Sequence, residues 1–98
     1  MPAPLDFYSR LAPYRYLGDD IGPQLVAGWP ADLQTRAIAL ADEVRSAVHA
    51  APGSVSAEDV HVAELLYHAI GTCLFEHGDA DQAQELLARA VRIRGAAP

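Results

Sequence analysis

Three stretches of the chain carry hydrophobic residues at alternating spacings of three and four, which is typical of amphipathic helices. Pro30 precedes the first stretch and suits the start of a helix. Ser56 precedes the second as an N-cap, and Gly78 ends it as a glycine just past a helix commonly does. Asp79 can then cap the third. The pattern predicts helices at about 31–51, 57–77 and 80–94.

Each predicted helix has a face expected to be buried, and together these faces predict one shared core. In the first helix Ile38 lies off the buried stripe and is expected to be exposed. The positions expected to be buried are Leu33, Ala37, Leu40, Ala41, Val44, Ala47 and Val48 in the first helix, Ala63, Leu66, Tyr67, Ile70, Cys73 and Leu74 in the second, and Ala83, Leu86, Leu87, Ala90, Val91 and Ile93 in the third.

Residues 1–30 have a different composition, with five of the seven prolines and five of the seven aromatic residues of the chain. Prolines at this density prevent a long helix, so we expect an irregular segment with short helical turns near 5–12 and 23–28. This segment is expected to lay its aromatic residues on the helices; the alternative is an arm that docks on another subunit. The predicted fold is an all-α three-helix bundle over 31–98 with this wrapping segment, forming one domain.

Composition and charge narrow the classes of function. The chain has 98 residues, 51% of them hydrophobic and 20% charged, which indicates one globular domain. A formal net charge of -6 disfavours nucleic acid as a partner. The single cysteine excludes an internal disulfide, and neither a secretion leader nor a membrane-spanning run is visible in the sequence. We therefore expect a cytoplasmic protein.

The segment 64–94 resembles one tetratricopeptide repeat, a pair of antiparallel helices. The matching positions are Tyr67, Ile70, Gly71, Leu74, Gly78, Ala83, Leu87 and Ala90. The small residues among them stand where the two helices would cross most closely. Such repeats usually need at least ~3 copies to form a stable core. One copy is visible here, so the helix at 31–51 and the aromatic segment are expected to supply the missing neighbours.

A second stripe on the helix at 57–77 points away from its buried face. His61, Leu65, His68, Thr72 and Phe75 recur at spacings of four, three, four and three, which is a heptad seam. In proteins with tetratricopeptide repeats the first helix of the repeat lines a groove that holds a partner. By this resemblance, the groove-lining positions are Leu65, His68, Thr72, Phe75 and Glu76. The competing interpretation is that Trp29, Tyr14 or their neighbours cover the stripe within one chain.

Other chemistry is weakly indicated. His61, Glu64 and His68 lie one or two helical turns apart, a spacing that can present metal ligands, but no matching pair stands on another helix. Cys73 falls on the inward face, where a thiol is usually an apolar filler. No convergent catalytic set is visible, so we expect no enzyme activity and no cofactor.

The sequence therefore predicts a non-catalytic protein-interaction module. Its partner is a protein segment or its own copy, with a homodimer favoured because a symmetric pair uses one patch twice. The alternatives are a protein that binds a metal or small ligand through its histidines, and a small accessory subunit that regulates an enzyme.

Overall fold

The computed structural model describes residues 7–15, 17 and 22–96, so the expected irregular segment 1–30 is seen only in part. The described residues contain five α-helices, one 3-10 turn and no strand, which confirms the all-α class. Two helices are short and belong to the N-terminal segment. The elements are α1 (Phe7–Leu11), η1 (Ala12–Tyr14), α2 (Gly22–Ala27), α3 (Ala31–Ala50), α4 (Ala57–Glu76) and α5 (Ala80–Ala96).

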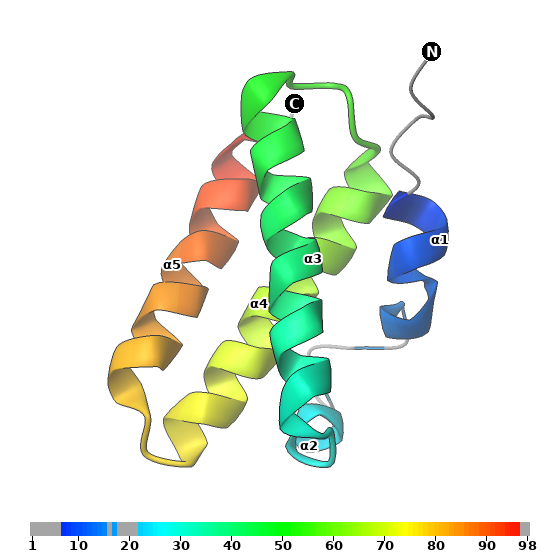
Figure 1. The fold of residues 1–98 in the computed structure, drawn as a ribbon. Helices are drawn as coiled ribbons and strands as arrows, with labels where there is room; N and C mark the ends of the chain where they lie inside the picture. Colours follow the sequence, from blue (N-terminus) through cyan, green and yellow to red (C-terminus); the bar gives the residue numbers. More distant parts are fainter. Residues whose placement is uncertain (1–6, 16, 18–21, 97–98) are drawn as a thin grey trace.

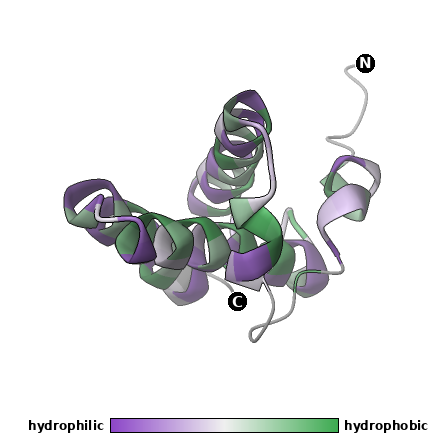
Figure 2. Cartoon of the chain, turned by 90° about the horizontal axis from the view of Figure 1, so that it is seen from below, coloured by the Kyte–Doolittle hydropathy of each residue, from purple (hydrophilic) through white to green (hydrophobic). Residues whose placement is uncertain are grey.

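The three long helices alternate in direction, and α4 lies at the centre of the arrangement (Figure 1). It packs most extensively against α5, and also contacts α3, α2 and α1. Seen from below, α3 lies on one side of the α4–α5 pair, and no other described long helix lies on the opposite side (Figure 2). That opposite side of α4 therefore faces away from the bundle.

Local signals place the ends of α4. The Ser56 Oγ accepts a hydrogen bond from the backbone N–H of Asp59 at 3.2 Å, which is the expected N-cap. At the other end Gly78 has φ +90, the left-handed conformation that favours glycine after a helix. The Asp79 carboxylate then accepts from the N–H of Gln82 at 3.3 Å and begins α5. The turn between the two helices is consequently short.

The α4–α5 crossing is close because Gly71 lacks a side chain. A Cβ at this position would lie 3.0 Å from the Cγ of Leu87 and 3.4 Å from the carbonyl oxygen of Ala83. Ala83 is itself fully buried. Small residues at a helix crossing allow the axes to approach, as expected for this hairpin.

The N-terminal segment packs on the bundle of its own chain. Phe7, Leu11, Leu17 and Val26 are buried in the same core as the residues of α3, α4 and α5. The ring centroids of Tyr14 and Trp29 lie 5.6 Å apart in a tilted pair. The described part of this segment thus fills the flank of α4 that faces away from α5.

Arg15 fastens the N-terminal segment to the start of α4. Its guanidinium donates to Glu58 and to Asp59, each at 2.8 Å, and to the carbonyl oxygen of Tyr8 at 3.1 Å. It also lies 4.2 Å from the centre of the Tyr8 ring, so a cation–π contact holds that exposed aromatic side chain. The contacts of Arg15 with Glu58 and Asp59 join residues more than forty positions apart.

A polar cluster ties the three long helices together around Tyr67, whose side chain is fully buried. The Tyr67 hydroxyl donates to Asp42 of α3 at 2.5 Å and accepts from Arg45 at 3.3 Å. Arg89 of α5 donates to both oxygens of Asp42 at 3.2 Å. Burial, and then the hydrogen bond to Asp42, raise the pKa of Tyr67, so the hydroxyl keeps its proton and donates.

Leu33, Ala47, Leu74 and Leu87 were expected in the core and are only half-buried, and the expectations for two further residues are wrong. Val91 was expected in the core, but 67% of it is exposed, because the buried line of α5 follows residues 83, 86, 90 and 93. Ile38 was expected to be exposed, yet it is half-buried and packs against the core. Both errors concern residues at the border of a helical face, where neighbouring helices decide burial.

Candidate functional site

The residues predicted to bind a partner lie together on the side of α4 opposite its core. We call this the outward face and define it as His61, Leu65, His68, Thr72, Phe75 and Glu76. His61, His68, Phe75 and Glu76 are exposed. Leu65 and Thr72 are half-buried at the edge of the packed helices. The face therefore combines accessible polar groups with accessible apolar groups.

Phe75 is the main apolar anchor of this face. It is 62% exposed, and the other large hydrophobic residues exposed to this degree in the described chain are Tyr8 and Val91. Tyr8 already stacks under the guanidinium of Arg15. Tyr14 and Trp29, which the competing interpretation placed over the stripe, pack on each other and leave Phe75 open. Exposed apolar residues that gather in a patch mark a contact surface, and Phe75 shares the outward face with the half-buried Leu65.

Val91 extends the apolar surface onto α5. Leu87 lies against Gly71 of α4, and Val91 follows it by one helical turn on the same side of α5. Sequence reasoning placed Val91 in the core and so missed it as a surface residue. The spacing of the buried residues 83, 86, 90 and 93 could have shown this. Position 91 follows position 90 by one residue, which turns its side chain by roughly 100° about the helix axis and away from the buried line.

A hollow of about 430 Å³ lies at the N-terminal end of the outward face. It is lined by His61, Glu64, Leu65, His68 and Arg94. Glu64 accepts hydrogen bonds from the guanidinium of Arg94, and this pair of lining residues joins α4 to α5. The hollow thus offers apolar surface between two imidazoles and an ion pair.

Charge is distributed unevenly along the α4–α5 hairpin. At the turn, Glu76, Asp79 and Asp81 form no ion pair with the described residues. At the other end stand Arg92 and Arg94 of α5 together with His61. Arg92 likewise forms no ion pair within the described chain, whereas the other six arginines do. The turn end of the hairpin is therefore acidic, whereas the opposite end carries Glu58, Asp59 and Glu64 beside its two arginines.

The histidines do not assemble a metal site. Among the described residues, no group of three or more His, Cys, Asp or Glu side chains is placed to hold one ion. Glu64, the carboxylate between His61 and His68 in the sequence, is engaged by Arg94. This geometry gives the metal alternative no support.

Cys73 and His77 lie close to each other but do not form an activated pair. Their Sγ and Nδ1 atoms are 3.7 Å apart. The same Nδ1 lies 2.7 Å from the carbonyl oxygen of Cys73, which can only accept, so Nδ1 carries the proton and cannot take one from the thiol. Burial, and then the charge of Glu76, raise the pKa of Cys73. A protonated, buried thiol is a poor nucleophile.

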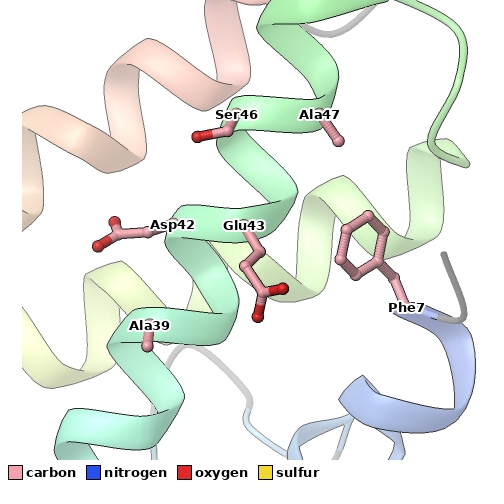
Figure 3. A pocket seen from close by; sticks show the side chains of 6 residues that line it. All are labelled: Phe7, Ala39, Asp42, Glu43, Ser46 and Ala47. Atoms are coloured by element: carbon pink, nitrogen blue, oxygen red, sulfur yellow. The ribbon is translucent and has the colours of Figure 1, made fainter.

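A larger hollow of about 570 Å³ lies between α1 and α3. Figure 3 shows Phe7 facing α3 across it, with Glu43 directed into the gap and Asp42 directed to the other side of the helix. Both carboxylates bind arginines of the chain itself, Glu43 with Arg10 and Asp42 with Arg89. The hollow is the seam between two packed elements, and the Ser46 hydroxyl lines it beside the two paired carboxylates.

Among the helices that the structure describes, none could serve as a membrane-spanning segment. Comparison with known proteins finds no family model, curated protein or solved structure that matches this chain. The resemblance of residues 64–94 to a tetratricopeptide repeat stays a prediction.

Proposed function

We propose that this protein is a non-catalytic interaction module that binds a protein segment or a second copy of itself through the outward face of α4. The observation that carries the proposal is the exposure of Phe75, 62% of which remains open after every described helix has packed. Burying a phenylalanine side chain contributes about 1.5–3 kcal/mol, and a partner would supply that burial.

The composition of the outward face supports a protein partner. Phe75 and Leu65 provide apolar anchors, while His68, Thr72 and Glu76 provide neutral and charged hydrogen-bonding groups beside them. Transient protein–protein interfaces combine such residues, with an aromatic anchor at the centre and polar residues at the rim. Cytoplasmic proteins seldom contain disulfides, and the single cysteine supports our placing this one there.

Site-specific photocross-linking in the native cells tests the proposal. A photoreactive amino acid is placed at His68 on the outward face, and as a matched control at Thr35, an exposed position on α3. We expect a discrete cross-linked product from position 68 and none from position 35. Identical patterns from the two positions would contradict the proposal.

The variant Phe75→Ser separates binding from folding. Because the ring is largely solvated, we expect the stability to change by no more than about 0.5 kcal/mol. The cross-link from position 68 should be lost in this background. A large fall in stability would instead show that Phe75 belongs to the core.

A further inference from the structure

Three carboxylates beside Phe75 lack a cationic partner in the described chain. They are Glu76, Asp79 and Asp81, which stand close together at the turn between α4 and α5. Every other carboxylate that the structure describes pairs with an arginine of the chain itself. The range 46–88 contains neither lysine nor arginine, so no local cation is available to these three. The Phe75 end of the outward face therefore keeps negative charge that the fold does not neutralise.

Glu76 stands where a negative charge is unfavourable for its own helix. It is the last residue of α4, and the final turn of that helix holds no basic residue. The unpaired carbonyl groups at the end of a helix favour a cation and disfavour a carboxylate. Asp79 and Asp81 differ in this respect, because they stand at the start of α5, where Asp79 caps the helix. A role in helix stability thus accounts for the two aspartates but not for Glu76.

The arginine that the chain leaves unpaired is too distant to neutralise the turn. Arg92 stands on α5 roughly 16 Å along the helix from Asp81, at about 1.5 Å per residue. Figure 1 shows the turn and the C-terminal end of α5 at opposite ends of the hairpin. A cation that pairs with Glu76 must therefore come from a binding partner.

We propose that the occupant of the outward face is a basic amphipathic segment of another protein. Its apolar side chains would cover Phe75 and Leu65, and its lysines or arginines would pair with Glu76 and Asp81. This inference rests on the proposed function, because it names the partner of the same face. Complementary charge steers such a segment to the face and fixes its orientation. A second copy of this chain suits the face less well, because its net charge is -6.

Three labelled helical peptides measure this preference by fluorescence anisotropy. The first combines leucine and lysine on opposite sides of the helix, the second has glutamate in place of lysine, and the third has serine in place of leucine. We expect only the leucine–lysine peptide to bind, because the face requires both an apolar side and a cationic side. Phe75→Ser should weaken this binding about tenfold.

Two double variants with the same change in net charge locate the carboxylates that act. Glu76→Gln with Asp81→Asn removes two charges beside Phe75 and leaves the cap at Asp79 intact. Glu43→Gln with Glu58→Gln removes two exposed charges elsewhere. The first pair should weaken binding of the leucine–lysine peptide about fivefold, and the control pair by less than about twofold. Circular dichroism of each variant verifies that the fold is retained.

The outcomes separate this inference from the proposed function. Equal effects of the two double variants, or binding of the leucine–glutamate peptide as tight as that of the leucine–lysine peptide, would overturn the inference. So would a failure of the leucine–lysine peptide to bind. A cross-link from position 68 that survives Glu76→Gln with Asp81→Asn, or whose product has the mass of two copies of this chain, overturns the basic partner and leaves the face in use. Absence of any cross-link from position 68 in the otherwise unchanged protein contradicts the proposed function itself.

Discussion

Replacing Tyr67 with phenylalanine tests whether the polar cluster holds the three long helices in register. The change removes only the hydroxyl, which donates to Asp42 at 2.5 Å and accepts from Arg45 at 3.3 Å. The ring stays in a fully buried position. The fold should therefore survive, with a lower free energy of unfolding.

The exposure of the partners sets the size of this loss. Hydrogen bonds to charged groups contribute about 1.5–3 kcal/mol. The side chain of Asp42 is 35% exposed and keeps its bonds to Arg89, and water can reach part of it. We therefore expect the lower half of that range, a loss of about 1.5 kcal/mol. For a domain of this length the melting temperature should fall by about 6–12 °C.

Urea denaturation followed by circular dichroism measures the loss, and a double-mutant cycle with Asp42→Asn assigns it. If the hydroxyl acts through this carboxylate, the two substitutions together should destabilise by about 1 kcal/mol less than the sum of the single effects. A loss below about 0.5 kcal/mol for Tyr67→Phe would refute the reasoning, since that is the range of neutral surface changes. Tyr67→Phe should leave any binding through the outward face unchanged, which makes it a stability control for Phe75→Ser.

Two further substitutions test the packing of the other helices. Gly71→Ala should lower the free energy of unfolding by about 1 kcal/mol in urea denaturation, because crowding against Leu87 outweighs the gain in helix propensity. The control Gly95→Ala should not destabilise the fold, because a Cβ there would have no atom within 4 Å. Equal effects of the two substitutions would show that the α4–α5 crossing is not tight. The hydrogen bond and ion pair with Arg10 lower the pKa of Glu43 below its ordinary value of 4.5. The pair therefore stabilises the fold fully above pH 4.5, and this contribution is lost as the pH falls through the lowered pKa of Glu43. Both partners are nearly half exposed, so Glu43→Gln should lower the free energy of unfolding by only about 0.5 kcal/mol at pH 7. The free energy of unfolding of this variant should also fall less steeply than that of the wild type as the pH is lowered. Parallel curves of free energy against pH for the two proteins would contradict this prediction.

The long helices could be predicted because their signals are local. Ser56 and Gly78 mark the ends of α4 within one residue of the expected range 57–77, and the apolar spacing identifies its buried face. The expected ranges 31–51 and 80–94 compare with α3 at Ala31–Ala50 and α5 at Ala80–Ala96. Such signals depend on a few neighbouring residues and need no knowledge of the tertiary structure.

The contacts between helices could not be predicted in the same way. Arg89 and Asp42 are 47 positions apart, and their pairing depends on the relative rotation and height of α3 and α5. Val91 was misassigned for the same reason, since its burial depends on which side of α5 the other helices occupy. Arg15 gives no local indication that it will bind the first turn of α4. Periodicity locates the face of one helix but not the neighbour that covers it.

The open side of α4 follows from how the chain uses its apolar segments. A central helix in a small bundle has more apolar surface than its neighbours cover unless each flank receives an element. Here α5 covers one flank, α3 covers the back, and α1 and α2 cover the other flank, where Gly22 approaches within contact of Ala69. The outward face receives none of the described helices, yet it keeps Leu65 and Phe75 rather than charged residues at both positions. A partner bound there, as we propose, would bury an aromatic side chain that the described helices leave in water.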